Sequence, residues 1–234
     1  MSGIDGNTLR IGGAQPVVFF DLDDTLYRSD SGVMDAISRR ITDFVILRFG
    51  KSQAEAERLR VHWRELYGTA LRGMREEGYS FDADSYFAFV HDIPLDLIAP
   101  VPHLRAAIEA LPARKLVLTN ADANHAWRVL WRLGLQECFE RVIDIKVMGF
   151  VNKPHVVAYQ NVQKMVDADA AACVLIDDVA ANTRGAMAAG WRAIRIADEV
   201  EDGVAHTTVP DVETAIESLR EAWGYPAPRF GKSE

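Results

Sequence analysis

Short, almost continuously apolar runs, each bounded by polar or turn residues, constrain the fold of this chain most. Three of them are Val17–Leu22, Lys115–Thr119 and Cys173–Ile176, and Ala193–Ile196 is a fourth. Continuous apolar runs of this length are typical of strands that are covered on both faces, as in a parallel sheet. A weaker strand candidate is Val142–Ile145.

Helical patterns alternate with these runs from residue 102 onward. The segments with helical spacing are Asn124–Leu133, Pro154–Val166, Ala180–Ala189 and Val212–Trp223. Regular alternation of strands and helices is typical of an α/β fold, in which right-handed crossovers connect the strands of a parallel sheet. We therefore expect an α/β core.

A long insertion follows the first apolar run. Asp21 and Thr119, at the ends of the first two runs, lie much farther apart than the roughly 30 residues of a βαβ unit. Between them, apolar residues recur three and four positions apart in Val33–Leu47 and again in Leu59–Met74, and a third short helix is expected over Asp84–Val90. The insertion is therefore predicted to be an α-helical cap.

These patterns divide the chain into parts. We expect the α/β core over residues 17–29 and 101–225, and the helical cap over 30–100. The Gly-rich and polar residues 1–16 are expected to be a disordered leader, and residues 226–234 a tail.

The charge balance excludes one class of partner. The 234 residues include 26 Lys and Arg against 34 Asp and Glu, for a net charge of −8. This acidity argues against a nucleic-acid polymer, but it leaves small anionic substrates open because a bound metal reverses the local field. No apolar run approaches the ~18 residues of a membrane span. Cys138 and Cys173 lie in apolar stretches and are expected to be buried thiols, which favours a cytoplasmic protein.

Carboxylates gather at the ends of two predicted strands. Asp21, Asp23 and Asp24 close the first, and Asp177 and Asp178 close the third. Unpaired carboxylates at the end of a buried strand are costly, and strand ends of open α/β sheets form the ligand crevice. Two carboxylates, waters and a phosphate oxygen suit the octahedral oxygen shell of Mg²⁺. The sequence therefore predicts a magnesium site there.

Donors for an oxyanion follow two other segments. Thr119 and Asn120 come after an apolar strand and before a helix, so they offer a hydroxyl, an amide and backbone N–H groups. Lys153 precedes Pro154 at the start of another predicted helix, so a rigid turn would hold its ammonium near the core. Each group lies at the carboxyl edge of its own βα unit, and together they favour a site for an oxyanion.

These motifs resemble, in order and spacing, the four motifs of the haloacid dehalogenase (HAD) superfamily of phosphohydrolases. They are Asp21-Leu22-Asp23-Asp24-Thr25, Thr119-Asn120, Lys153-Pro154 and Asp177-Asp178. The resemblance covers Val17 to about Ile196. It implies a Rossmann-like parallel sheet with helices on both faces, a small cap inserted after the first strand, and phosphoryl oxygens held by the second and third motifs. It also places the first and third strands side by side.

The resemblance implies a two-step phosphoryl transfer. Asp21 would be the nucleophile that forms an aspartyl-phosphate, and Asp23 would be the general acid for the leaving alcohol and then the base for water. Proton donation near neutral pH requires a raised pKa, which burial of Asp23 beside other carboxylates is expected to give. Thr25 is expected to orient Asp23.

The same resemblance implies the ligands of Mg²⁺. They would be the Asp21 carboxylate, the main-chain carbonyl of Asp23 and Asp177, with Asp178 or Asn182 nearby or bound through water. Dehalogenases of this fold lack an aspartate at the position of Asp23, because a leaving halide needs no acid. The motif therefore favours a phosphatase over a dehalogenase, and a phosphomutase, which uses the same acid, stays open.

Cap and core strings resemble the pyrimidine 5′-nucleotidase branch of the superfamily. They are Tyr67-Gly-x-x-Leu-Arg-Gly73, Thr119-Asn-Ala-x-x-Asn-His-Ala126, Lys153-Pro-His155 and Ile176-Asp-Asp-x-x-x-Asn182. This branch hydrolyses nucleoside monophosphates such as UMP and CMP. By the resemblance, Tyr67, Arg72 and His125 are candidates for the nucleoside side of the pocket. The two cap glycines suggest close approach of a ligand or a neighbouring helix.

Alternatives to this prediction stay open. Within enzymes they are a general small-phosphomonoester phosphatase and a sugar phosphomutase, and outside enzymes a non-catalytic binding module. The expected partner is a small phosphorylated substrate, with no nucleic-acid polymer and no membrane. The aromatic segment Tyr86–Phe89 suits either an interface or the core of the cap, so monomer and homodimer are both open.

Overall fold

The computed structural model describes residues 15–225 and contains a six-stranded sheet. All five strand pairs are parallel, and the order across the sheet is β3-β2-β1-β4-β5-β6. The strands are β1 (Val17–Phe20), β2 (Arg114–Leu118), β3 (Arg141–Ile143), β4 (Cys173–Asp177), β5 (Arg192–Ile196) and β6 (Thr207–Val209). The predicted parallel α/β sheet is confirmed.

Strand β1 lies at the point where the order of the sheet reverses. It pairs with β2 on one side and β4 on the other, with Phe20 opposite both Val117 and Ile176. The backbone N–H of Asp21 still donates to the carbonyl of Ile176 at 2.9 Å. In open α/β sheets this reversal opens a crevice at the carboxyl ends of the strands. The adjacency of the first and third predicted strands is therefore confirmed.

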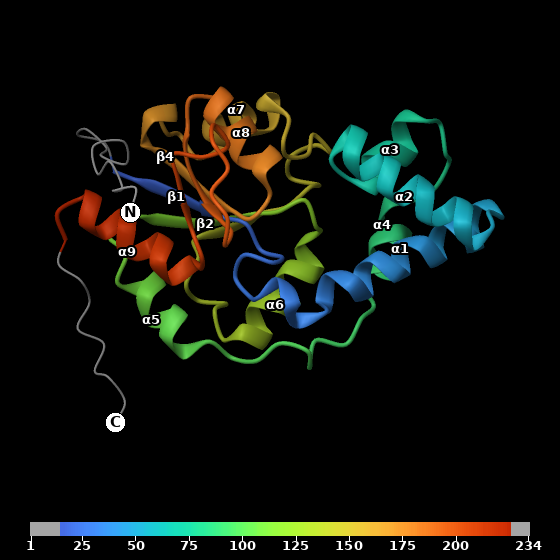
Figure 1. The fold of residues 1–234 in the computed structure, drawn as a ribbon, viewed down its shortest axis with the longest axis horizontal. Coiled ribbons are helices and arrows are strands. Elements are labelled where there is room, and N and C mark those ends of the chain that lie inside the picture. The colour runs from blue at the N-terminus through green and yellow to red at the C-terminus, as the bar shows by residue number, and fades with distance from the viewer. Residues whose placement is uncertain (1–14, 226–234) are drawn as a thin grey trace.

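Helices cover both faces of the sheet (Figure 1). Val18 and Phe20 of β1 pack into one apolar cluster with α5, α6 and α9, whereas Val17 and Phe19 pack into a second with α7 and α8. The side chains of a strand alternate between faces, so a wholly buried strand needs this cover on both sides. The helices are α5 (Pro102–Glu109), α6 (Ala123–Leu133), α7 (Val156–Met165), α8 (Ala180–Ala188) and α9 (Val212–Ala222).

Four helices form the cap, which lies to the right of the sheet in Figure 1. They are α1 (Val33–Phe49), α2 (Gln53–Tyr67), α3 (Ala70–Glu76) and α4 (Ala83–Val90). The expected single helix over Leu59–Met74 is wrong, because α2 ends at Tyr67 and Gly68 caps it with a φ of +83°. Gly73 follows in α3, where a Cβ would lie 2.3 Å from the Trp63 side chain. The cap glycines were expected to allow close approach of a ligand or of a neighbouring helix. At Gly73 the approach of a neighbouring helix is confirmed.

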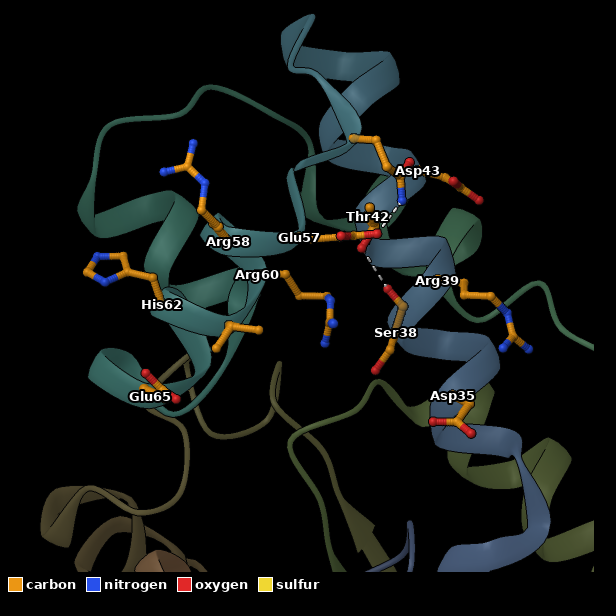
Figure 2. A pocket seen from close by; sticks show the side chains of 12 residues that line it. Asp35, Ser38, Arg39, Thr42, Asp43, Glu57, Arg58, Arg60, His62 and Glu65 are labelled. Atoms are coloured by element: carbon orange, nitrogen blue, oxygen red, sulfur yellow. Dashed lines mark hydrogen bonds between the residues drawn. The ribbon is translucent and has the colours of Figure 1, made fainter. Parts of the chain in front are cut away.

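A polar groove runs between α1 and α2 on the cap (Figure 2). Its volume is about 770 Å³, and charged side chains of both signs line it.

The aromatic segment of α4 packs inside the cap. Tyr86 and Phe87 are buried, and Tyr86 packs against Phe44 of α1 with ring centroids 5.1 Å apart. Those two residues therefore belong to the core of the cap.

Two elements were missing from the sequence-based prediction. They are α5, which begins at Pro102, and the three-residue strand β6. Both cysteines are buried free thiols, as expected. The expected tail and residues 1–14 of the expected leader lie outside the described residues. Among residues 15–225, no helix has both the length and the apolar character needed to cross a membrane.

Candidate active site

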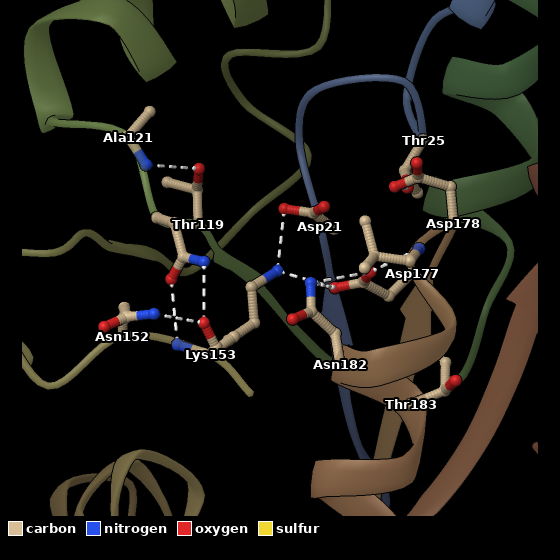
Figure 3. Close-up of polar contacts among 12 residues, drawn as sticks. Asp21, Thr25, Thr119, Ala121, Asn152, Lys153, Asp177, Asp178, Asn182 and Thr183 are labelled. Atoms are coloured by element: carbon tan, nitrogen blue, oxygen red, sulfur yellow. Dashed lines mark hydrogen bonds and ion pairs between the residues drawn. The ribbon is translucent and has the colours of Figure 1, made fainter. Parts of the chain in front are cut away.

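Asp21 and Asp177 lie side by side because β1 and β4 are neighbours. The ammonium of Lys153 lies between them, with Nζ 2.8 Å from an Asp21 oxygen and 2.6 Å from an Asp177 oxygen (Figure 3). The side chains of Lys153 and Asp177 are fully buried, and that of Asp21 is 11% exposed. Burial lowers the pKa of Lys153, but the Asp177 and Asp21 carboxylates outweigh it and the net pKa is raised. The three groups form a buried, charged cluster at the strand ends.

The turn that carries Lys153 is fixed by the residues around it. The Asn120 side chain accepts a hydrogen bond from the Lys153 backbone N–H at 2.9 Å and donates to its carbonyl at 3.0 Å. On the other side, α8 approaches so closely that a Cβ on Gly185 would lie 2.1 Å from the Pro154 carbonyl oxygen. Only glycine fits there. These contacts position the lysine between the two carboxylates.

Further carboxylates surround this cluster. One oxygen from each of Asp21, Asp177 and Asp178 lies within 4.8 Å of the others. Burial, and then the Asp177 charge, raise the pKa of Asp178 to about 6, while burial and the Asp178 charge raise that of Asp24 to about 7. Burial also raises the pKa of Asp21, against the opposing charge of Lys153. Carboxylates that repel one another fit a divalent cation, which these oxygen ligands would hold.

Asp23 is held by two donors on one of its oxygens. The Tyr27 hydroxyl donates to Oδ1 at 2.7 Å, and Nε2 of His125 lies 2.8 Å from the same atom. Burial raises the pKa of Asp23, but the His125 charge and both hydrogen bonds outweigh it, so the net pKa is lowered. The expected raised pKa is therefore wrong for the protein alone. Thr25 was expected to orient Asp23, but its hydroxyl donates to Asp178 at 3.3 Å instead.

A second histidine packs behind this contact. The ring of His91 stacks on that of His125 with centroids 4.2 Å apart, and its Nδ1 lies 2.7 Å from an Asp122 oxygen. Asp122 also caps α6, accepting from the backbone N–H groups of Asn124 and His125. Asp122 therefore holds both histidines in place. Through them, the contacts that position the Asp23 carboxylate reach from the core to His91 at the end of α4.

Thr119 lies just after the end of β2, near Asp21 and Lys153 (Figure 3), and Asn120 follows it in the sequence. Thr119 is buried, and its hydroxyl accepts from the Ala121 backbone N–H at 3.0 Å, which leaves its own proton available to donate. The side-chain amide of Asn120 is engaged with the Lys153 backbone. Thr119 can therefore donate to an oxyanion, while Asn120 positions Lys153.

A cavity of about 590 Å³ lies between these residues and the cap. Asp21, Asp23, Thr119 and Lys153 line its core side, and Tyr67 lines its cap side. Of the other two pocket candidates, neither is in the lining. Arg72 donates to Asn152 at 3.4 Å and to Glu76 at 3.3 Å, and the fully buried His125 lies behind Asp23.

Some residues around the site were missed by reasoning from the sequence. They are Tyr27, Arg60, Arg64, His91, Asp122 and His155. Tyr27 follows Asp23 by four positions, a spacing that could have suggested a local contact. Asp122 and His155 lie within the strings around Thr119 and Lys153 but were given no role. Arg60, Arg64 and His91 come from other segments and carry no pattern that would have identified them.

Comparison with known proteins identifies the family. Residues 16–190 match the family described as haloacid dehalogenase-like hydrolase. Phosphate metabolism protein 8 of Saccharomyces cerevisiae is 31% identical over 138 residues, which is 55% of this chain and 43% of that protein. The bifunctional riboflavin kinase/FMN phosphatase of Arabidopsis thaliana is 23% identical over 217 residues, which is 89% of this chain and 56% of that protein. The chain thus matches about half the length of these curated relatives.

Solved structures share the fold at low sequence identity. L-2-haloacid dehalogenase from Xanthobacter autotrophicus has a TM-score of 0.56 at 16% identity, covering 88% of this chain and 99% of that one. A HAD phosphatase from Thermococcus onnurineus has a TM-score of 0.57 at 16% identity, covering 88% and 96%. The HAD-hydrolase YfnB of Bacillus subtilis, solved bound to magnesium, has a TM-score of 0.53 at 16% identity, covering 91% and 100%. With three quarters of its length matched by the family, this chain belongs to the haloacid dehalogenase-like hydrolases.

Proposed function

We propose that this hydrolase is a Mg²⁺-dependent phosphatase that cleaves phosphate monoesters through an aspartyl-phosphate on Asp21, and that its substrates are pyrimidine nucleoside 5′-monophosphates. The observation that carries the proposal is the convergence of Asp21, Asp23 and Lys153 on one cavity. A nucleophile, an acid–base group and a cation are the parts that phosphoryl transfer needs.

Asp21 is the nucleophile of the first step. Its carboxylate oxygen attacks phosphorus, a new O–P bond forms, and the P–O bond to the alcohol breaks. Lys153, 2.8 Å from Asp21, keeps that carboxylate oriented and offsets charge on the phosphoryl oxygens. The free hydroxyl proton of Thr119 is available to one of those oxygens.

Asp23 moves the protons of both steps. It gives a proton to the leaving alkoxide and then takes one from the water that hydrolyses the aspartyl-phosphate, which releases phosphate and restores Asp21. Although the pKa of Asp23 is lowered in the protein alone, a bound phosphate dianion raises it, because a nearby negative charge disfavours the carboxylate. Tyr27 and His125 hold Oδ1, so Oδ2 is left for the substrate.

The carboxylates of Asp21 and Asp177, with the main-chain carbonyl of Asp23, would hold Mg²⁺, and Asp178 would lie nearby. Bound there, the ion would neutralise the phosphate and the crowded carboxylates. The pKa of Asp178, raised to about 6 by burial and then by the Asp177 charge, supports this assignment, because a bound cation would favour the carboxylate form.

The fold does not decide between phosphatase and dehalogenase, because neighbours of both kinds share it. The presence of Asp23, held by two donors beside the nucleophile, favours the phosphatase. A halide leaves without a proton, so a dehalogenase has no use for this arrangement.

The nucleotide part of the proposal rests on the cap strings and on the cavity. Its cap side is built largely from apolar and aromatic residues, which suits a planar base. The FMN phosphatase relative suggests flavin mononucleotide as a second nucleotide to test.

The mechanism is tested first. Asp21→Asn is expected to abolish phosphate release from UMP while far-UV circular dichroism and the thermal midpoint stay unchanged, and EDTA is expected to abolish release reversibly. Activity that survives in Asp21→Asn contradicts the mechanism.

The substrate is tested with a panel of UMP, CMP, AMP, FMN, glucose 6-phosphate and β-glucose 1-phosphate. We expect kcat/KM to be at least about ten-fold higher for UMP and CMP than for the sugar phosphates, or about 1.4 kcal/mol. Equal values across the panel indicate a general phosphatase. Conversion of glucose 1-phosphate to glucose 6-phosphate without net phosphate release indicates a phosphomutase.

A further inference from the structure

A cap arginine lies where the groove between α1 and α2 meets the site cavity. Arg60 extends from α2 toward α1 (Figure 2). It lines both the groove and the cavity, as do Ser38 and Glu65, so the two hollows meet at these residues. Arg60 thus lines the same cavity as Asp21, Thr119 and Lys153.

The Arg60 side chain has donors that the protein does not use. Its Nε atom is buried and has no hydrogen-bond acceptor among residues 15–225. Two other cap arginines do have protein acceptors: Arg40 donates to the Phe89 carbonyl and Arg72 to Asn152. Guanidinium groups only donate, and a buried donor without an acceptor is unfavourable. Solvent does not reach this Nε, but the terminal Nη groups of Arg60 likewise donate to no residue in the described range, and they are the donors left for a ligand.

The surroundings of Arg60 indicate the kind of ligand. Ile37 and Ile41 of α1 and Tyr86 and Phe87 of α4 line the same cavity. Arg64, one turn after Arg60 on α2, lines it too. Apolar and aromatic walls suit the faces of a flat ring, while donor-only arginines suit oxygen acceptors on its edge.

We propose that Arg60 is a specificity-determining residue, whose guanidinium donates to the ring carbonyl oxygen of the pyrimidine in the leaving nucleoside. This inference rests on the proposed nucleotidase function. Uracil and cytosine both carry a carbonyl at C2, whereas a ribose phosphate without a base carries no such acceptor. Sites that hydrogen-bond a substrate group reject analogues lacking it, because their own polar groups are left unpaired.

The experiment compares UMP with ribose 5-phosphate, which has the same reacting group and no base. In Arg60→Met we expect kcat/KM for UMP to fall about ten-fold or more, while the value for ribose 5-phosphate stays within about two-fold. Loss of one hydrogen bond to a charged donor accounts for a change of that size. Arg58→Met is the matched control, since Arg58 is exposed on the same helix and lines the groove but not the cavity.

A binding measurement gives a readout that does not depend on turnover. Calorimetric titration with uridine is expected to show weaker binding to Arg60→Met than to Arg58→Met and the wild type. Arg60→Lys, which keeps the charge but loses the planar fork, is expected to recover only part of the affinity. The thermal midpoint of Arg60→Met is expected to be no lower than that of the wild type, because no protein acceptor loses a partner and a buried unpaired donor is removed.

Each contrary outcome has a distinct meaning. If the wild type prefers UMP and Arg60→Met keeps the same preference, this inference is overturned and the nucleotidase proposal stands. If the wild type shows no preference for nucleotides, the nucleotidase proposal fails and this inference with it. If Arg60→Met loses activity only on esters with a carboxylate in the leaving group, such as 2-phosphoglycolate, Arg60 binds a second anion and the base assignment is wrong.

Discussion

Nε2 of His125 lies 2.8 Å from Oδ1 of Asp23, across a sequence separation of 102 positions. The contact joins the first turn of α6 to the loop after β1, and the imidazole is fully buried. Since the pKa of Asp23 is lowered and its carboxylate accepts, Nε2 is the donor. His125 therefore acts as a positioning residue for Asp23.

Loss of this donor is expected to lower kcat. In His125→Ala we expect kcat to fall about ten- to a hundred-fold with KM changed less than about two-fold, because proton transfer by a misplaced Asp23 is slower. Steady-state phosphate release measures both constants. His125→Gln, which keeps a donor, is expected to restore part of kcat, and His62→Ala on the exposed face of α2 is the control. Equal kcat values in all three variants would refute the positioning role.

Removal of the buried ammonium is expected to destabilise the fold. Lys153→Met leaves Asp21 and Asp177 buried beside each other without their counter-charge. Breaking a buried ion pair by removing one partner costs about 3–5 kcal/mol of unfolding free energy. Urea unfolding of this variant and of the exposed control Lys164→Met measures the difference. A loss below about 1 kcal/mol would show that the carboxylates do not depend on Lys153.

The contact between α8 and the lysine turn can be tested with one methyl group. Gly185→Ala would place Cβ 2.1 Å from the Pro154 carbonyl oxygen, so the turn must move. We expect a loss of about 1–3 kcal/mol from overpacking together with reduced kcat, because Lys153 moves with the turn. Gly73→Ala, crowded against Trp63 inside the cap, is the comparison, with a similar loss of stability and a smaller effect on kcat. If kcat of Gly185→Ala equals that of the wild type, the position of the Lys153 turn does not affect catalysis.

Stability is expected to fall below about pH 6.5 in part because of His206. Burial, and then the Arg192 charge, lower the pKa of His206 from its ordinary value of 6.5. Its Nδ1 also accepts from the Ala193 backbone N–H at 3.1 Å, which requires the neutral ring. As pH falls below 6.5, the unfolded chain therefore takes up a proton before the folded one does, and stability decreases until the folded pKa is passed.

The measurement is urea unfolding between pH 7.5 and 5. His206→Gln, which keeps an acceptor but does not titrate, is expected to lose less stability over this range than the wild type. Burial also lowers the pKa of His91, so some dependence of stability on pH is expected to remain in the variant. An identical slope in both proteins would contradict the role of His206.

The sheet and its carboxylates could be predicted because their signals are local. Most strands show as short apolar runs in the sequence. Asp21 directly follows β1, and Asp177 is the last residue of β4. The adjacency of β1 and β4 came from the family resemblance, since strand order depends on crossovers that no single segment encodes. Strand β6 was missed because its three residues, Thr-Thr-Val, form no apolar run.

Side-chain partners from distant segments could not be predicted. The pKa of Asp23 was expected to rise because its neighbours in sequence are acidic, but His125 reverses the sign from 102 positions away. The stack of His91 on His125 depends on how α4 meets α6. The end of α2 at Gly68, by contrast, could have been predicted from the sequence, because a glycine after a helical run commonly ends the helix.

The central claim is that Asp21 becomes phosphorylated during turnover. Asp23→Asn is expected to slow hydrolysis of the aspartyl-phosphate, so the intermediate accumulates when the variant is mixed with Mg²⁺ and p-nitrophenyl phosphate, whose leaving group needs little acid assistance. Acid quenching and peptide mass spectrometry are then expected to find one phosphoryl group on the peptide that contains Asp21, and none in Asp21→Asn. A phosphoryl group on another residue, or turnover by Asp21→Asn at the rate of the wild type, would contradict the account.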